Sequence, residues 1–557
     1  MSEKERTLVV GIDGGCWPYL NPLLESGQLP AIQKLVTEGV HGILESTMPP
    51  VTPVAWTSFA TGKNPGKHGI FSWLWRRPGT WEFLPFSGSQ RVGSPWWSYL
   101  NDKGLRVGLV NIPMTYPPAP LEGFTICGFG APASASNLTY PETLYRELSE
   151  KFDWSGDVVS QSIPLTDGGW QAFEAGKIVQ DKNVRSAIYL ADKHQVDVLA
   201  INLMLLDHCN HLASDEAVLQ QAIRQCDQHL SELIQGFQPD NVMVFSDHGS
   251  RRVTGEFLLG LWLQDNGYLL WDKRTEWSKA DLNWLLIGLF RQHLNWTGWF
   301  EKLARGLTRE FLWFLPPATM AQFWKSAGPK TPALYAQYLF KDTTDFARSP
   351  FHLEDWGSIY LNIIGRDPEG VVVPTKEEQL RHELVERLLS ISDPETNTPL
   401  FSRVYQSHDL YDGQLTKFAP DLALDYFSSC WSLTKGMPAN VQTHAKYFTP
   451  PRERWHGDHT RQGLFILSGG SFGSKNLAQT AHITDIPATL LYLLGCSIPE
   501  DWDGLPLLNL MAPRFVDSHQ VTSQTGDDPT MTASDYDFSE QEIAQISEHL
   551  RALGYLN

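Results

Sequence analysis

Two hydrophobic patterns alternate along most of the chain. Short runs of consecutive apolar residues occur at 7–12, 106–112, 124–130, 197–205, 241–245 and 463–468. Such runs are typical of strands buried on both faces of a sheet. Between them, apolar residues recur every three to four positions, as at Leu219, Ile223, Leu230 and Leu233, which predicts amphipathic helices. The alternation predicts an α/β protein with a mostly parallel central sheet and helices on both faces.

Changes in the residue pattern along the chain also predict where this α/β core is interrupted. An aromatic-rich helical pattern predicts an inserted cap, and a polar stretch predicts a flexible linker before a last amphipathic helix that begins with a Ser539–Glu542 capping box. We expect that helix to dock on the body of the protein or on a partner. The expected divisions are core 1–265, helical insert 266–345, core 346–512, linker 513–535 and C-terminal helix 536–557.

Composition narrows the classes of partner. The 557 residues carry a formal charge of −19, which argues against a nucleic-acid backbone as the main partner. A phosphate substrate is still allowed, because bound divalent metals can reverse the local sign of charge. The six cysteines are scattered without a CxxC pair, and the sequence shows neither a signal peptide nor a transmembrane run. We expect a cytoplasmic protein, with the aromatic insert either packed on the core or in peripheral contact with a membrane.

Aspartate and histidine residues recur where predicted strands end or begin. They are Asp13, Asp207 with His211, Asp247 with His248, and His459. Each alone has a simpler explanation, such as a turn aspartate or a surface histidine. Together they are expected to converge, because the carboxyl ends of parallel strands meet at one edge of a sheet. Six oxygen and imidazole ligands without sulfur fit two zinc-like ions, each with three protein ligands and an open position.

A predicted helix from Thr52 to Thr61 begins with Thr-Pro. Thr52 fits an N-cap with Pro53 at the first helical position. The same position places a hydroxyl at the positive end of a helix, where a phosphate can bind. The local pattern leaves both interpretations open, and Thr57 competes with Thr52 as a nucleophile.

The motifs together resemble the alkaline phosphatase superfamily in its nucleotide pyrophosphatase/phosphodiesterase branch. They are GIDGG at 11–15, TPVAWTSFATGKNPGKHGI at 52–70, DHCNH at 207–211, SDHG at 246–249 and GDHT at 457–460. More narrowly, the chain looks like the microbial group of predicted phosphohydrolases and phosphomutases. The resemblance implies an alkaline-phosphatase-like fold and a small phosphoester substrate such as a nucleotide.

The resemblance also implies roles for individual residues. Thr52 would be the nucleophile of a two-metal phosphodiesterase that forms a covalent phosphothreonine. One metal would be held by Asp13, Asp247, His248 and Thr52, and the other, which activates water, by Asp207, His211 and His459. The metals would be Zn²⁺, with Mn²⁺ as the alternative.

Substrate and reaction type are less defined by sequence. Trp56, Thr57, Lys63 and Arg461 are candidate substrate contacts, although packing or a solvated surface charge explains each as well. A phosphomonoesterase or phosphomutase, a phospho-head-group transferase, and a catalytically inactive scaffold remain as alternatives. The complete ligand set argues against the scaffold, and the oligomeric state is open.

Overall fold

A nine-stranded sheet forms the centre of the computed structural model. The structure describes residues 5–77, 79–132, 135–156, 167–270, 344–435, 447–451, 455–473, 479–526 and 538–552. The strands lie in the order β20 (Gln479–His482), β2 (Val40–Glu45), β19 (Gln462–Gly469), β9 (Asn241–Phe245), β1 (Thr7–Ile12), β8 (Val198–Leu203), β5 (Val107–Ile112), β6 (Gly123–Cys127) and β7 (Thr139–Tyr140). Only β19 and β7 run antiparallel to their neighbours. The prediction of a mostly parallel sheet is confirmed.

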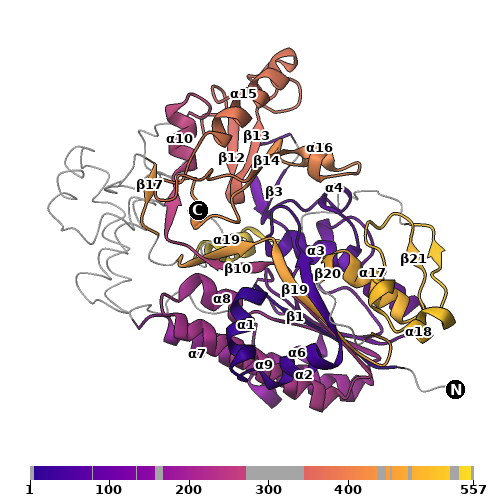
Figure 1. The fold of residues 1–557 in the computed structure, drawn as a ribbon. Coiled ribbons are helices and arrows are strands. Elements are labelled where there is room, and N and C mark those ends of the chain that lie inside the picture. The colour runs from indigo at the N-terminus through magenta and orange to yellow at the C-terminus, as the bar shows by residue number, and fades with distance from the viewer. Residues whose placement is uncertain are drawn as a thin grey trace, which may run out of the picture.

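Alternation along each strand divides the apolar side chains between two cores. In β1, Leu8, Val10 and Ile12 pack into one core, whereas Val9 packs into the other. The first core is covered by α1 (Trp17–Glu25), α2 (Pro30–Glu38), α6 (Thr143–Phe152), α7 (Trp170–His194) and α9 (Glu216–Phe237). The second is covered by α3 (Thr52–Thr61), α5 (Trp96–Asp102), α17 (Asp485–Leu493) and α18 (Pro513–Ser518) (Figure 1). Helices therefore cover both faces, as the periodicity predicts.

A second, antiparallel sheet stands apart from the central one. It contains β12 (Phe351–Glu354), β13 (Ser358–Leu361), β15 (Leu422–Asp425) and β14 (Arg403–Gln406), with α15 (Glu377–Leu389) and α16 (Ser407–Leu410) beside it at the top of Figure 1. We call residues 346–427 the antiparallel lobe. The sequence pattern predicts a core strand at 357–363, but β13 pairs with β12 and β15 instead. After residue 346, the first strand of the central sheet is β19. The described residues of 346–461 therefore contribute no strand to that sheet.

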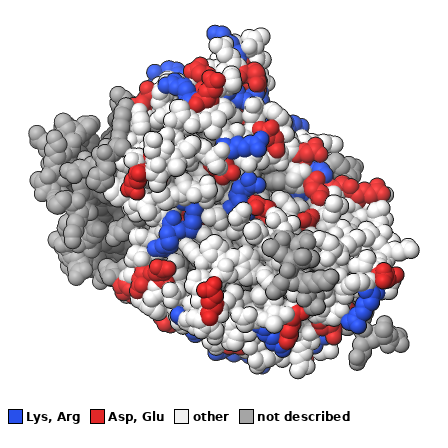
Figure 2. All heavy atoms as spheres, viewed as in Figure 1, with Lys and Arg blue, Asp and Glu red and all other residues white. Residues whose placement is uncertain are grey.

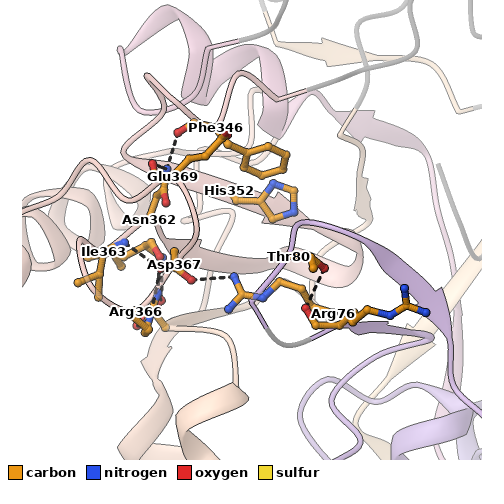
Figure 3. A network of polar contacts seen from close by, with 12 residues as sticks. Arg76, Thr80, Phe346, His352, Asn362, Ile363, Arg366, Asp367 and Glu369 are labelled. Atoms are coloured by element: carbon orange, nitrogen blue, oxygen red, sulfur yellow. Dashed lines mark hydrogen bonds and ion pairs between the residues drawn. The ribbon is translucent and has the colours of Figure 1, made fainter. Parts of the chain in front are cut away.

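A hairpin that follows α3 and α4 (Pro65–His68) joins the lobe to the core. It consists of β3 (Leu74–Arg76) and β4 (Phe83–Pro85). Arg76 Nη1 lies 2.8 Å from Asp367 Oδ1 in the lobe (Figure 3). Trp81 stacks on Phe346 with ring centroids 4.0 Å apart. The Asp367 side chain is fully buried and also pairs with Arg366, so it holds the hairpin to the lobe through Arg76.

Shorter elements complete the described structure. Beside the core lie α8 (Leu205–Leu212), β10 (Gly249–Arg252) paired with β18 (Gly457–Thr460), α10 (Leu259–Asp265), and a small sheet of β16 (Trp431–Leu433), β11 (Gly255–Phe257) and β17 (Phe448–Thr449). The expected insert, with its predicted membrane contact, falls almost wholly on 271–343, outside the described residues. Across the part of the chain that is described, no helix has the length and apolar character needed to cross a membrane.

The C-terminal region is more ordered than the sequence pattern predicts. Within the expected linker 513–535, the structure forms α18 and also β22 (Ser523–Gln524), which pairs with β21 (Ile498–Pro499). Residues 527–537 lie outside the described part. The last helix, α19 (Glu540–Ala552), has the expected capping box, and Phe538 before it stacks on Tyr116. The helix therefore docks on the body, which confirms one of the two expected arrangements.

The surface carries both signs of charge. On the face shown in Figure 2, Lys and Arg side chains are interspersed with Asp and Glu side chains. Positive and negative side chains are thus mixed on this face.

Candidate metal centre

Six aspartate and histidine side chains from distant parts of the sequence meet at one edge of the central sheet. Asp13 follows β1, Asp247 and His248 follow β9, and Asp207 and His211 lie on α8 directly after β8. Strands β9, β1 and β8 are neighbours, which explains the convergence. His459 reaches the site from β18, which pairs with β10 just after His248. All six residues are at most 1% exposed.

The six residues form two sets. The carboxylate-rich set is Asp13, Asp247 and His248, whose ligand atoms lie within 4.8 Å of one another. His248 is also within that distance of Asp207 and His459, so it lies between the sets.

The histidine-rich set is Asp207, His211 and His459. Nε2 of His211 and Nε2 of His459 lie 3.3 and 3.4 Å from Asp207 Oδ1 and 3.0 Å from each other. The structure thus brings together the residues of both sets that the sequence predicts.

Backbone carbonyls fix how the three histidines are oriented. Nδ1 of His211 lies 2.9 Å from the Gly457 oxygen, and Nδ1 of His459 lies 2.8 Å from the Pro50 oxygen. Nδ1 of His248 lies 3.1 Å from the Gly249 oxygen. A carbonyl can only accept, so each Nδ1 donates, and Nε2 of a neutral imidazole then has its lone pair free for a metal ion. Metal-binding histidines commonly have this arrangement.

Burial and like charge dominate the carboxylate-rich set. Burial, reinforced by the charge of Asp207, raises the pKa of Asp13 to about 8. Burial together with Asp13 and Asp207 raises the pKa of Asp247 well above its usual range. Burial also lowers the pKa of His248, so the set lacks a positive charge of its own.

The histidine-rich set has the opposite balance. Burial alone would raise the pKa of Asp207, but the charge and hydrogen bonds of His211 and His459 hold it well below its usual range. Burial acts to lower the pKa of His211, yet Asp207 outweighs it and raises that pKa. This set therefore neutralises part of its own charge.

Thr52 is the first residue of α3 and does not serve as its cap. The N-cap is Val51, no side chain caps the helix, and Pro53 follows Thr52. The prediction of a Thr52 N-cap is therefore wrong by one residue. Thr52 Oγ1 is fully buried and makes no hydrogen bond with the described residues. The segment leading to it is anchored at the site, because the Pro50 carbonyl binds His459 Nδ1.

The donor set fits divalent cations. Thr52 Oγ1, Asp13 Oδ1, Asp247 Oδ2 and His248 Nε2 are buried polar atoms without a hydrogen bond among the described residues. Nε2 of His248 lies 3.2 Å from Asp247 Oδ2 and 3.5 Å from Asp13 Oδ1, as expected for atoms that face a common centre. Unpaired buried carboxylates are costly unless a cation compensates them. Oxygen and imidazole donors without sulfur suit zinc or manganese.

Three of the four candidate substrate contacts have other roles. Trp56 is fully buried, with its ring 5.3 Å from that of Phe245, and the Thr57 hydroxyl donates to the Pro53 carbonyl 2.6 Å away. The buried Lys63 forms an ion pair with Asp501. Packing and pairing within the protein account for these three side chains, and their contact with substrate stays a prediction.

Arg461 is the fourth candidate contact. Its Nη1 lies 3.1 Å from the Tyr405 hydroxyl and 3.5 Å from Asp425 Oδ2, in the antiparallel lobe. Its contact with substrate stays a prediction.

Sequence reasoning missed residues that support the ligands. Asn202 donates from Nδ2 to Asp13 Oδ2 over 2.9 Å. Its signal was a polar residue inside the apolar run of β8. Trp455 stacks on His211 at 4.1 Å, and Trp356 stacks on His459 at 4.6 Å. Trp455 stands next to the GDHT region in sequence, whereas nothing in the local pattern distinguishes Trp356.

Solved structures share this fold at low sequence identity. Phosphonoacetate hydrolase from Sinorhizobium meliloti 1021, in complex with phosphonoformate, is 14% identical, with a TM-score of 0.50 over 87% of this chain and 94% of that one. A mutant of alkaline phosphatase PafA is 12% identical, with a TM-score of 0.50 over 92% of this chain and 100% of that one. An inactive murine ectonucleotide pyrophosphatase/phosphodiesterase 5 with AMP is 13% identical, with a TM-score of 0.46 over 91% and 100%. The similarities to the first two structures confirm the alkaline-phosphatase-like fold.

Sequence comparison identifies the family. Comparison with curated proteins gave no significant match. The model of type I phosphodiesterase / nucleotide pyrophosphatase matches residues 7–306, which is more than half of the chain and includes five of the six clustered ligands. The chain belongs to the type I phosphodiesterase / nucleotide pyrophosphatase family, and it is a phosphoester hydrolase.

Proposed function

We propose that the protein is a two-metal phosphodiesterase, similar to the nucleotide pyrophosphatases, that acts through a covalent phosphothreonine on Thr52. The observation that carries the proposal is the Thr52 hydroxyl, which is buried and has no described hydrogen-bond partner at the start of α3. It follows a segment bound to His459. A helix N-terminus favours a phosphate there, and an uncommitted hydroxyl is available for attack.

The residues divide the reaction into two displacements. In the first, Thr52 Oγ forms a bond to phosphorus while the ester P–O bond breaks, and the alcohol leaves with the proton that the hydroxyl gives up. In the second, a water oxygen bonds to phosphorus, the bond to Thr52 Oγ breaks, and the hydroxyl regains a proton. The carboxylate-rich set with Thr52 would hold one divalent ion and the histidine-rich set the other. Such ions supply charge neutralisation and lower the pKa of a bound hydroxyl or water.

Zinc and a cytoplasmic location are part of the proposal. Imidazole and carboxylate ligands in sets of three are typical of catalytic zinc sites. All six cysteines are free, which is typical of a reducing compartment.

A matched pair of threonine variants tests the nucleophile. Thr52→Ala should lower kcat for bis-p-nitrophenyl phosphate on the order of 10³-fold or more, while metal content stays near two ions per chain. Thr57→Ala removes a hydroxyl from the same helix and should leave kcat nearly unchanged. Phosphorylated Thr52 should be found by mass spectrometry after acid quenching. Full activity of Thr52→Ala would refute the assignment, and a strong preference for the monoester would indicate a phosphatase.

A further inference from the structure

The turn that leads from β2 into α3 is bound by the antiparallel lobe. Tyr411 stands directly after α16 in that lobe, and its hydroxyl donates to the Met48 carbonyl oxygen over 2.7 Å. Met48 lies four residues before Thr52, the proposed nucleophile. The lobe therefore contacts the catalytic segment close to the attacking hydroxyl, although Tyr411 and Met48 are 363 positions apart in sequence.

The carbonyl oxygens of residues 48–50 all accept hydrogen bonds. The first accepts from Tyr411, and the third accepts from His459 Nδ1 over 2.8 Å. The second accepts from the Thr47 hydroxyl, 2.9 Å away, and from the Val51 N–H, 3.0 Å away. Of these four donors, two belong to the turn itself, one is a metal ligand of the proposed site, and Tyr411 belongs to the lobe. The conformation of the turn thus depends on a side chain from outside the central sheet.

The same lobe segment also binds the chain beyond α3. The Leu415 N–H donates to the Gly66 carbonyl oxygen in α4 over 2.9 Å, and the Asp412 N–H donates to Asn64 Oδ1 over 3.2 Å. Figure 1 shows α16, which precedes this segment, beside α4. Because α4 follows α3 closely in sequence, the lobe holds the helix that begins with Thr52 at both of its ends.

The Tyr411 side chain is itself fixed by packing. It is buried, and its ring meets that of Phe71 edge-on, with the centroids 5.2 Å apart. Leu410 and Ala419 complete this small apolar cluster. Burial raises the pKa of the Tyr411 phenol, so the hydroxyl keeps its proton and donates it to the carbonyl. A rigid ring therefore carries the hydrogen bond from the lobe to the turn.

A second contact from the lobe reaches the turn through a metal ligand. The ring of Trp356 stacks on that of His459 at 4.6 Å, and His459 in turn binds the Pro50 carbonyl. Trp356 has a φ of 62°, which is rare for a bulky residue and persists only where the surrounding structure imposes it. The lobe thus acts on two neighbouring carbonyls of the turn, directly at Met48 and indirectly at Pro50.

We propose that Tyr411 is a positioning residue, through which the antiparallel lobe sets the position of Thr52 Oγ1 for attack on phosphorus. This inference rests on the proposed phosphothreonine mechanism and adds to it a residue from outside the metal centre. A reacting group that is displaced by about 1 Å can lose on the order of 100-fold in rate. Since Tyr411 binds the backbone of the turn, loss of its hydroxyl should lower kcat and leave both KM and metal content unchanged.

Removal of one hydroxyl tests the proposal. Tyr411→Phe keeps the ring against Phe71 and should lower kcat for bis-p-nitrophenyl phosphate about 10- to 100-fold, with unchanged KM and two ions per chain. Tyr492→Phe is the matched control, because the buried Tyr492 donates its hydroxyl to the His519 carbonyl, 2.8 Å away, between α17 and the end of α18. The control should keep the kcat of the wild type. Equal kcat in the two variants would overturn the proposal.

A variant within the lobe separates positioning from general loss of lobe structure. Ser407→Ala removes the hydrogen bond from the Ser407 hydroxyl to the Pro420 carbonyl at the start of α16 and leaves the Tyr411 hydroxyl in place. It should retain kcat, even if it lowers the melting temperature as much as Tyr411→Phe does. Tyr411→Leu removes the ring as well and should lower kcat further than Tyr411→Phe. A loss of kcat in Ser407→Ala as large as that in Tyr411→Phe would overturn the role of this one contact.

Hydrogen exchange distinguishes failure of this inference from failure of the proposed function. If Thr52→Ala keeps full activity, the phosphothreonine mechanism fails, and amide exchange over residues 46–58 is then compared among the metal-loaded variants. Exchange that is at least several-fold faster in Tyr411→Phe, but not in Tyr492→Phe or Ser407→Ala, would support positioning of the turn by the lobe alone. Unchanged exchange in Tyr411→Phe would overturn that as well.

Discussion

The two ligand sets solve the problem of buried charge in different ways. In the carboxylate-rich set, burial and mutual repulsion raise the pKa of Asp13 to about 8 and also raise that of Asp247 well above its usual range. In the histidine-rich set, Asp207 keeps a low pKa because His211 and His459 compensate it. The first set needs an external cation or protons, whereas the second is partly balanced by its own side chains.

This difference means that removal of metal should affect the sets unequally. Without a cation, protons are the available compensation for Asp13 and Asp247. Asp207 retains its imidazole partners under the same conditions. The metal-free protein should therefore carry most of its electrostatic strain in the carboxylate-rich set, although both sets are equally buried.

The largest effects should come from neutralising one aspartate in each set. Asp13→Asn and Asp207→Asn should each lower kcat on the order of 10³-fold or more, because each removes a predicted ligand and one ion per chain. Mass spectrometry measures the number of bound ions per chain, and turnover of a nitrophenyl diester measures kcat.

In the metal-free protein, the two substitutions should shift the melting temperature in opposite directions. At pH 8, Asp13→Asn should raise the melting temperature of the metal-free protein, because it removes a buried charge that no cation balances. Asp207→Asn should lower it, because His211 and His459 lose their anion. Calorimetry on chelator-treated protein measures both melting temperatures. If the two variants shift in the same direction, the two sets do not differ in how their buried charge is compensated.

Loss of the Asn202 amide should weaken metal binding by the carboxylate-rich set and leave metal binding by the histidine-rich set unchanged. Asn202→Ala removes the hydrogen bond to Asp13 Oδ2, and outer-shell losses of this kind typically cost about 10- to 100-fold in metal affinity. Competition with a fluorescent chelator should show one weakened ion and one unchanged ion. Equal weakening of both would mean that the sets do not bind independently.

The stability of the metal-free protein should fall with increasing pH. Folded Asp13 keeps its proton up to pH about 8, whereas an unfolded aspartate loses it near pH 4. The folded state therefore binds the extra proton between roughly pH 4 and pH 8, and stability is lost across that window. Urea midpoints should decline for the wild type and decline less for Asp13→Asn. Parallel slopes in the two proteins would show that Asp13 does not titrate as described.

Removal of the indole over His211 should have the smallest effect. Trp455 stacks on that ring at 4.1 Å, and such contacts contribute about 0.5–1.5 kcal/mol. Trp455→Leu should weaken the ion of the histidine-rich set about two- to tenfold, with Trp455→Phe as the conservative control. Chelator competition measures the metal affinity of both variants. If only the ion of the carboxylate-rich set is weakened, the stack does not support the histidine-rich set.

Sequence predicts the centre of this protein well because strong local patterns fix it. The apolar run at 241–245 matches β9 residue for residue, and Asp247 stands two residues after it. Chemistry at strand ends is visible from sequence once a parallel sheet is inferred, since neighbouring strand ends must meet. Five of the six clustered residues were predicted in this way, whereas His459 stands just before a predicted strand.

The errors concern contacts that local patterns do not encode. The short strands of the antiparallel lobe resemble core strands, and only their partners, as in the pairing of β13 with β12, show that they form another sheet. Thr52 and Thr57 look alike in sequence, yet one hydroxyl is bonded within its helix and the other has no described hydrogen bond. Asn202 has a role only because Asp13, 189 positions away, lies beside it.

The position of β19 has a consequence for how the protein must be made. This strand comes from residues 462–469, yet it lies between β2 and β9, which are both formed from the first 245 residues. During synthesis, β2 cannot join the rest of the sheet until most of the chain has left the ribosome. His459, three residues before β19, arrives at the same time. In pulse-labelled nascent chains, β2 should therefore become resistant to protease at the same chain length at which the second ion first binds. Binding of that ion would then mark completion of the fold.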